Sequence, residues 1–398
     1  MLKLQESTTK EEHLFSLQSS VSNGRMQYQL SSTTYSGYTL DFVLQHDEKR
    51  FYKGYSVKVY LFKNPYFLQG DVVELRVGND IPIKSRIGYF FRLDALFEDQ
   101  TVELSDHTYC FARYGIEYIF GQAESLQTKI PTISATPPKI GDFFEDDTVI
   151  LVVCDQLTAG ISNFSIEHHL PSLFLSGFTF FSNINPIEYL NNSNLIETNY
   201  QKVKQNTPID SHSILKIAAS NIHLVGEYFL YYLFNSLLQR KNEVITRFII
   251  LYQVVEVLID KIIIFEVQTK VCENLSNMTG KKVKDVLSEQ STERKRIQLL
   301  FNTYTKLSDH QKSALKQSLL DFFFHVGDLE YSEIEEHESL QLANIFYDFR
   351  NKLVHNYRLL HDPGIDVATT VQMMEKINLE AEVVIASFII SFSPREMA

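Results

Sequence analysis

Short hydrophobic stretches typical of β-strands dominate the chain from about residue 25 to about residue 180. In one of them, Val57, Val59 and Leu61 alternate with other residues, so they share one face of a strand. Most stretches are rich in β-branched or aromatic residues and end at Gly, Asp, Asn or Pro. Their close spacing favours a mostly antiparallel sandwich or barrel. We predict strands over YSVKVYLF (55–62), DVVELRV (71–77), IGYFFRLDALF (87–97), YGIEYIFG (114–121) and TVILVVC (148–154).

From about residue 213 onward, the hydrophobic period becomes that of α-helices. Leu224, Tyr228 and Tyr231 are examples of this spacing. Helix breakers at Gly280 and Pro363 divide the pattern. The short connections favour an antiparallel bundle. We predict helices over residues 214–240, 243–275, 281–304, 308–326, 338–360 and 366–391.

These two patterns predict an α+β fold, with an N-terminal β-rich domain (an antiparallel sandwich or a barrel) followed by a C-terminal all-α bundle. The apolar stretch 244–267 is expected to be a buried helix. Its longest charge-free run, Phe248–Val255, is far shorter than the ~20 residues needed to cross a bilayer. The predicted segments are an irregular N-terminal segment (1–24), a β-rich sensor or regulatory domain (25–180), a connecting region rich in Asn, Ser and Thr (181–212) and the helical bundle (213–398).

The net charge of −12 is unevenly distributed. Residues 1–200 contain 15 Lys and Arg against 24 Asp and Glu, and no Lys or Arg occurs between Lys139 and Lys202. Because protein cations replace the counterions of a nucleic-acid backbone, we expect any RNA contact in the C-terminal half. The three cysteines form no CxxC pair, and the charged N-terminus has no signal-peptide pattern. Both observations favour the cytoplasm.

The helix predicted over 338–360 contains polar residues that a buried helix does not need. Arg350, Asn351 and His355 lie among its apolar positions. Asn351 and His355 are four residues apart and share a face, and the long Arg350 side chain can bend toward the same side. The apolar positions with helical spacing are Leu342, Ile345, Phe346, Phe349, Leu353 and Tyr357.

These polar residues suit transfer at a phosphodiester. Histidine exchanges protons near neutral pH, and arginine presents a planar, permanently charged fork to phosphate oxygens. Arg350 would stabilise the added negative charge of the transition state, and Asn351 would orient the histidine or the substrate. No carboxylate cluster adjoins them in sequence, so no metal or other cofactor is implied. The structural alternative is a capping and salt-bridge role, with Asp348 or Glu375 as a partner.

The segment RNKLVH, Arg350 to His355, resembles the R-x(4–6)-H motif of the HEPN superfamily, including the polar residue directly after the arginine. The stretch RFIILYQVVEVLID (247–260) resembles the helix that carries a glutamate in related HEPN domains. The resemblance covers roughly residues 214–392. It implies a helical bundle that forms homodimers, in which two motifs meet in one composite site. Active members are metal-independent endoribonucleases: the 2′-hydroxyl of RNA attacks the adjacent phosphate and leaves a cyclic phosphate.

The resemblance also assigns roles. His355 would be the general acid and base, Arg350 would hold the scissile phosphate, and Asn351 would support them. Glu256 would either face this site or pair with a cation in the bundle, and pairing is the favoured interpretation.

Tyr357 would stack on a base or, by the favoured interpretation, pack in the core. The residues that would hold the RNA backbone, or form a solvated helix face, are Lys281, Lys282, Lys284, Arg294, Lys295, Arg296, Lys352 and Arg358.

Other chemistries have little support in the sequence. The EHHL segment (167–170) lacks a third metal ligand at a suitable interval, and no G-x-S-x-G elbow or glycine-rich nucleotide loop is present.

Two functions remain open. The first is an RNA-cleaving antiviral effector or toxin, regulated by an N-terminal domain that binds a phage protein, a partner subunit or the helical half itself. The second is a non-catalytic HEPN-like module that dimerises and scaffolds a partner. Burial of Arg350 and His355 against carboxylates of their own chain would favour the second.

Overall fold

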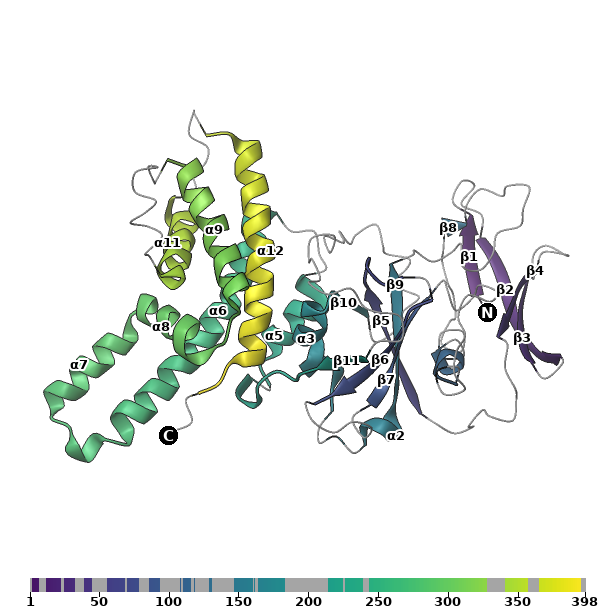
Figure 1. Cartoon of the computed structure of the whole chain (residues 1–398), viewed down its shortest axis with the longest axis horizontal. Helices are drawn as coiled ribbons and strands as arrows, with labels where there is room; N and C mark the ends of the chain where they lie inside the picture. Colours follow the sequence, from purple (N-terminus) through teal and green to yellow (C-terminus); the bar gives the residue numbers. More distant parts are fainter. Residues whose placement is uncertain are drawn as a thin grey trace. The chain divides into compact units, whose positions relative to one another are not determined.

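Strands and helices segregate along the chain in the computed structural model of this protein (Figure 1). The predicted α+β class is confirmed. Residues Met1–Ala219 and Tyr231–Lys241 form one unit, and Ser220–Leu230 and Asn242–Ala398 form the other. The structure describes residues 2–6, 12–22, 25–32, 39–44, 56–68, 70–78, 86–93, 108, 110–115, 118, 129–130, 147–159, 161, 164–182, 214–224, 226–238, 243–327, 341–356 and 365–394.

The first sheet has the strand order β4-β3-β2-β1-β8. Strands β1 to β4 pair antiparallel with their sequence neighbours, and β8 pairs parallel with β1. The prediction of an irregular segment over 1–24 is therefore wrong. Phe15, Leu17 and Val21 do alternate, but the many Ser and Gln residues between them resemble a loop in composition. The bounds are β1 (Leu2–Glu6), β2 (Glu12–Ser22), β3 (Arg25–Ser32), β4 (Thr39–Leu44) and β8 (Lys129–Ile130).

The second sheet has the order β10-β5-β9-β7-β6-β11 and is built around β9. All seven residues of β9 are buried, as expected of a continuous apolar run inside a sheet. Gly88 of β7 faces β9, and a Cβ there would lie 2.1 Å from the Val152 carbonyl oxygen, so only glycine fits. The bounds are β5 (Val57–Lys63), β6 (Val72–Val77), β7 (Arg86–Arg92), β9 (Thr148–Cys154), β10 (Thr179–Ser182) and β11 (Ile214–Ile217).

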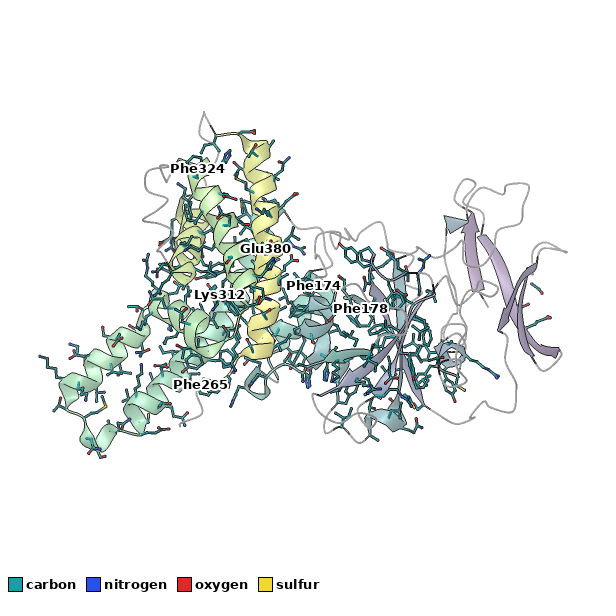
Figure 2. The ribbon with its side chains drawn as sticks, in the orientation of Figure 1. Phe174, Phe178, Phe265, Lys312, Phe324 and Glu380 are labelled. Carbon is teal, nitrogen blue, oxygen red and sulfur yellow. The ribbon has the colours of Figure 1, made fainter. Side chains whose placement is uncertain are left out.

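Aromatic side chains fill the core beside this sheet. Phe178 stacks on Phe90 with ring centroids 4.2 Å apart, and it meets Phe62 edge to face at 6.1 Å. Figure 2 labels Phe178 together with Phe174, which contacts Phe234 at 5.5 Å. The strands predicted over 55–62, 71–77, 87–97 and 148–154 correspond to β5, β6, β7 and β9, although β7 ends at Arg92.

Three other sequence predictions are wrong in the described residues. The single helix predicted over 281–304 is interrupted at Thr292, whose extended backbone separates one helix ending at Ser291 from the next beginning at Glu293. Residues 110–115 are helical, although the strand YGIEYIFG was predicted to begin at Tyr114. Residues Ile214–Ile217 were predicted to begin a helix, but they form β11, which pairs parallel with β6. Four residues are too few to distinguish helix from strand by hydrophobic period, and pairing with the edge of β6 decides the outcome. The predicted bundle (213–398) thus gives β11 and residues Tyr231–Lys241 to the first unit.

The second unit contains the long helices, and α12 packs against both α9 and α6 (Figure 1). Their bounds are α6 (Val244–Val267), α7 (Gly280–Ser291), α8 (Glu293–Leu299), α9 (Asp309–His325), α11 (Leu342–Asn356) and α12 (Val367–Ser391). π-Helical turns at η9 (Gln268–Cys272) and η11 (Leu300–Tyr304) extend α6 and α8. Short elements occur in both units. The first unit has α2 (Asp155–Thr158), η4 (Ile166–His169), α3 (Leu170–Leu175) and η8 (Leu233–Leu237), the second has η7 (Ile222–Leu224) and η10 (Leu275–Asn277), and α5 (Tyr228–Tyr232) includes residues of both.

Capping residues fix where the long helices begin. Ser308 and Gln311 form a capping box at α9, and the Asp366 side chain accepts a hydrogen bond from the Ala368 amide at α12. Across the described ranges, none of the helices has the length and hydropathy required to cross a bilayer. Of the connecting region predicted over 181–212, residues 181–182 belong to β10. The rest lies outside the described residues.

Candidate functional site

Helix α11 carries the Arg350 motif and is fixed by its apolar face. Phe349 has no exposed surface, and its ring meets those of Phe248 and Phe322 edge to face at 4.8 and 4.9 Å. Ile345, Phe346 and Leu353 are buried on the same face, as the sequence pattern predicts. Arg350 and Asn351 directly follow Phe349 on the helix. The packing of the Phe349 ring therefore fixes the backbone positions from which both polar side chains extend.

The Arg350 guanidinium lies over an aromatic ring near the surface of the bundle. Its Cζ atom is 5.2 Å from the ring centroid of Tyr252, which is a cation–π distance. Its Nη1 donates a hydrogen bond to Asn351 Oδ1 at 3.0 Å. The side chain is 21% exposed, so a ligand can reach the guanidinium from solvent. The stacked arginine therefore has a defined position and an accessible side.

Two carboxylates flank this guanidinium. Glu256 Oε1, from α6, lies 3.8 Å from Arg350 Nη2, and Glu293 Oε2, from the first residue of α8, lies 4.0 Å from Nη1. Both distances exceed those of N–H···O hydrogen bonds, so the attraction is electrostatic and leaves the N–H donors uncommitted to these oxygens. Glu256 thus lies beside a cation of the bundle, and that cation is Arg350 of the candidate site, so this contact fits both interpretations of Glu256.

Tyr252 connects the ring and the carboxylates. Its hydroxyl donates a 2.6 Å hydrogen bond to Glu293 Oε1, and its ring stacks on Phe346 with centroids 5.8 Å apart. Burial raises the pKa of the Tyr252 phenol above its ordinary value, and the hydrogen bond to Glu293 raises it further. The phenol is therefore a neutral donor at physiological pH.

Sequence reasoning missed Tyr252 and Glu293. Tyr252 is four residues before Glu256, so the two share a face of α6, and this spacing could have found it. Glu293 had no comparable signal, because only the fold brings the start of α8 to α11. The described contacts thus join Arg350, Asn351 and Glu256 of the predicted set with these two unpredicted residues.

His355 makes no described contact with this cluster within one chain. It is exposed in the last turn of α11, and no hydrogen bond or ion pair joins it to another residue in the described part of the chain. Asp348, proposed in the structural alternative as a partner for the motif, is hydrogen-bonded to Arg294 instead. Arg350 is thus partly buried beside carboxylates of its own chain, whereas His355 is open to solvent.

Six of the eight predicted RNA-contacting residues lie on α7 and α8, and they fall into two groups. Lys281, Lys282 and Lys284 are exposed in the first turns of α7. The other three are paired with carboxylates: Arg294 with Asp348, Lys295 with Glu289 at 3.8 Å and Arg296 with Asp260 at 3.0 Å. Those three must exchange a carboxylate for a phosphate to hold RNA.

The remaining predicted residues lie after the motif arginine. Lys352 is half-buried on α11. Tyr357 and Arg358 lie outside the described residues.

The EHHL histidines are in η4, where the His168 ring contacts Tyr231 and the His169 ring contacts Phe164. In the portion of the chain that the structure describes, no group of three or more His, Cys, Asp or Glu residues is arranged to hold a metal ion.

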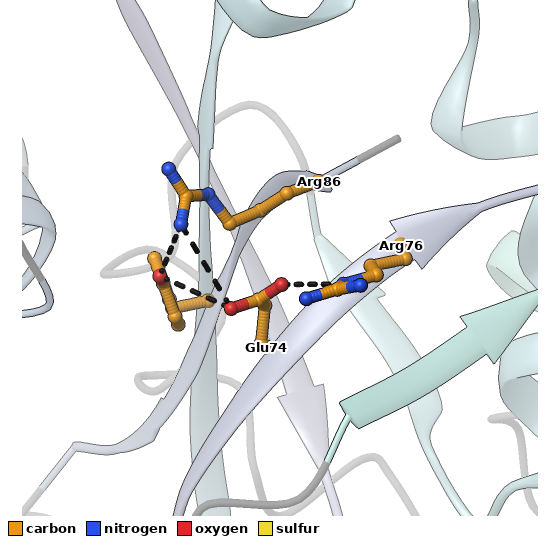
Figure 3. Close-up of polar contacts among 4 residues, drawn as sticks. Glu74, Arg76 and Arg86 are labelled. Carbon is orange, nitrogen blue, oxygen red and sulfur yellow. Dashed lines mark hydrogen bonds and ion pairs between the residues drawn. The ribbon is translucent and has the colours of Figure 1, made fainter. Parts of the chain in front are cut away.

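A second charged cluster lies on strands β6 and β7 (Figure 3). Arg76 Nε donates to Glu74 Oε1 at 2.5 Å, and Arg86 Nη1 lies 3.9 Å from Glu74 Oε2. The Tyr89 hydroxyl accepts from Arg86 at 3.2 Å and donates to Glu74 at 3.4 Å. Glu74 and Arg76 belong to β6, and Arg86 and Tyr89 belong to β7, so this network stabilises the pairing of the two strands.

Comparisons with known proteins do not bear on either cluster. No protein-family model, curated protein or solved structure matches this chain. The resemblance of RNKLVH to the HEPN motif therefore stays a prediction, and a function must be inferred from the contacts around Arg350.

Tyr252 makes the unfolding free energy of the second unit change with pH in the alkaline range. Because its pKa is raised in the folded state, its contribution is fully present below about pH 10, the ordinary tyrosine value, and is lost as the pH rises toward the folded-state pKa. We expect the Tyr252→Phe variant to lose unfolding free energy less steeply than the parent above about pH 10. Urea denaturation at a series of pH values, followed by helical circular dichroism, measures both slopes.

The matched control is Tyr228→Phe, at a tyrosine of the same unit that is 87% exposed. This variant should keep the slope of the parent. Equal slopes for Tyr252→Phe and the parent would show that the Tyr252 phenol has an ordinary pKa.

Proposed function

We propose that this chain is a metal-independent endoribonuclease of the HEPN type. The observation that carries the proposal is the Arg350 guanidinium, which is stacked on Tyr252 and makes one hydrogen bond, to Asn351, among the described residues. A guanidinium has five N–H donors in a planar fork that matches phosphate oxygens. Arg350 therefore has donors available for a scissile phosphate, and its aromatic support preorganises it.

His355 supplies the proton transfers in this proposal. An exposed imidazole accepts the proton of the RNA 2′-hydroxyl, and the 2′-oxygen attacks the adjacent phosphorus. The bond from phosphorus to the 5′-oxygen breaks, and that oxygen takes a proton from an imidazolium. The products are a 2′,3′-cyclic phosphate and a 5′-hydroxyl. Arg350 stabilises the negative charge on the phosphorane, and no step requires a metal ion.

A homodimer completes the site in this proposal. No described contact joins His355 to Arg350 within one chain, and Val354, which is 48% exposed, lies beside His355 on α11. Two copies of α11 meeting across a two-fold axis would bury Val354 and bring both motifs to one cleft. The composite site would then have two histidines, one to accept and one to donate a proton.

The N-terminal unit is the proposed sensor. Residues 1–200 have 15 Lys and Arg against 24 Asp and Glu, a charge balance that disfavours RNA backbone contact and suits recognition of a protein. We propose that this unit binds a phage protein or a regulatory subunit in the cytoplasm and releases the nuclease activity in antiviral defence or growth arrest. The exposed lysines of α7 would contribute a weaker contact to RNA.

A second function is favoured by the carboxylates beside Arg350. Glu256 and Glu293 together outweigh the single positive charge of Arg350, and this local excess of negative charge opposes the binding of a phosphate. The corresponding function is a non-catalytic HEPN-like module that dimerises and scaffolds a partner.

Cleavage kinetics separate these two functions. We expect Arg350→Ala and His355→Ala each to lower RNA cleavage by about 100-fold or more, because they remove the transition-state charge partner and the proton acceptor. The matched control is His310→Ala, at an exposed histidine on α9, which should cleave at the parental rate. Single-turnover cleavage of labelled RNA measures all three. Undiminished cleavage by both α11 variants would exclude the proposed site.

The dimer is tested by a charge placed on the exposed face of α11. Val354→Glu would set two like charges against each other across a two-fold interface, so we expect dimerisation to weaken by about 100-fold or more, with loss of cleavage. Val367→Glu is the matched control, since Val367 is 47% exposed at the start of α12. Analytical ultracentrifugation measures the mass. A Val354→Glu variant that remains dimeric and active would contradict this interface.

A further inference from the structure

Arg350 lies next to two carboxylates without forming a close pair with either. The nearest oxygen–nitrogen distances are 3.8 Å to Glu256 and 4.0 Å to Glu293. A free carboxylate and a guanidinium usually form bidentate hydrogen bonds at about 2.7–2.9 Å. Glu293 is only 25% exposed, so solvent alone does not account for its separation from Arg350. Some other contact must hold this carboxylate back.

That contact is the Tyr252 hydroxyl. It donates a 2.6 Å hydrogen bond to Glu293 Oε1, and the opposite oxygen, Oε2, is the one that faces Arg350. Tyr252 itself is only 4% exposed, and its ring is packed on Phe346 and Phe248. A buried, neutral donor therefore anchors one oxygen of Glu293, which limits how far the carboxylate can rotate toward the guanidinium.

We propose that Glu293 is an internal competitor of the RNA phosphate for Arg350, and that Tyr252 is the positioning residue that limits this competition. The inference rests on the proposed function. Carboxylate and phosphate recognise the same planar fork, so a Glu293 that closes on Arg350 occupies the donors that a phosphate needs. Any change that loosens the bond from Tyr252 to Glu293 shifts Arg350 toward its closed, self-paired state and lowers the affinity for RNA.

Two substitutions separate the effect of the Tyr252 hydroxyl from that of the Glu293 charge. Tyr252→Phe keeps the aromatic ring beneath Arg350 and removes only the hydroxyl, which frees Glu293 to close. Glu293→Gln removes the negative charge and therefore the competitor, while its amide oxygen can still accept from Tyr252. In the double variant the freed side chain is neutral, so the loss caused by Tyr252→Phe should disappear.

The test measures binding of 2′-O-methyl RNA, which has no nucleophilic 2′-hydroxyl and cannot be cleaved by the proposed reaction. We expect Tyr252→Phe to weaken binding by about three- to tenfold, the usual range for one net hydrogen bond. Glu293→Gln should bind at least as tightly as the parent, and the double variant should bind like Glu293→Gln. Fluorescence anisotropy of a labelled oligonucleotide measures the four dissociation constants.

The kinetic signature differs from that of a general loss of structure. A competing closed state raises KM for RNA and leaves kcat unchanged, whereas partial unfolding lowers kcat. Tyr304→Phe is the matched control. Tyr304 is also 4% exposed, and its hydroxyl donates a 2.8 Å hydrogen bond to Glu266 elsewhere in the same unit. This variant should bind RNA like the parent.

The outcomes separate this inference from the nuclease proposal. If Tyr252→Phe binds like the parent, or if the double variant stays as weak as Tyr252→Phe, the inference fails even where Arg350→Ala abolishes cleavage. If the expected binding pattern appears but the parent cleaves no RNA, the nuclease proposal fails and the inference stands. A parent protein that neither binds 2′-O-methyl RNA nor cleaves RNA overturns both.

Discussion

The packing of Phe349 between Phe248 and Phe322 is the contact on which the candidate site depends. It attaches α11 to α6 and α9 through edge-to-face rings with no exposed surface at Phe349. Fully burying a side chain of this size contributes about 1.5–3 kcal/mol, and the ring geometry adds to it. Because Arg350 is the next residue, this contact also sets the path of the guanidinium onto Tyr252. The polar site is thus positioned by its apolar neighbour in the sequence.

The electrostatic balance of the site follows from that geometry. A half-buried guanidinium faces one aromatic ring and two carboxylates, and it hydrogen-bonds to neither carboxylate. The ring supports the cation without occupying its N–H donors, which is the feature that suits a phosphate ligand. The carboxylates act in the opposite direction. In our proposal, the affinity of this site for phosphate therefore depends on how firmly the Tyr252 hydroxyl holds Glu293.

Periodicity in the sequence predicted the parts of this structure that local patterns determine. Ile345, Phe346, Phe349 and Leu353 of the predicted apolar stripe are buried as expected, whereas Leu342 is half-buried, and the continuous run of β9 is buried throughout. The strands of residues 1–24 were missed because Ser and Gln between the apolar positions resemble a loop. The β11 strand was missed because four residues are too few to distinguish the two periods. In each case the pairing partner, which the local sequence does not show, decides the structure.

In the candidate site, too, residues that follow a local pattern were predicted, and residues that depend on contacts between elements were missed. Arg350, Asn351 and His355 were singled out by their spacing on one helix together with the resemblance to the HEPN motif, and Glu256 by that resemblance alone. Glu293 was not found, since its relevance arises only when α8 and α11 are packed together in the fold. Tyr252 resembles an ordinary core aromatic residue, and only its hydroxyl distinguishes it. Side-chain contacts between helices are therefore the part of the candidate site that a single sequence predicts least well.

The chemistry of the cleaved RNA ends tests the central claim most directly. RNA incubated with the purified full chain in the presence of EDTA is analysed for its 3′ ends by mass spectrometry. Attack by the 2′-hydroxyl without a metal ion predicts fragments with 2′,3′-cyclic phosphates and 5′-hydroxyls. Intact RNA, cleavage that EDTA abolishes, or fragments with 3′-hydroxyl ends would contradict the account.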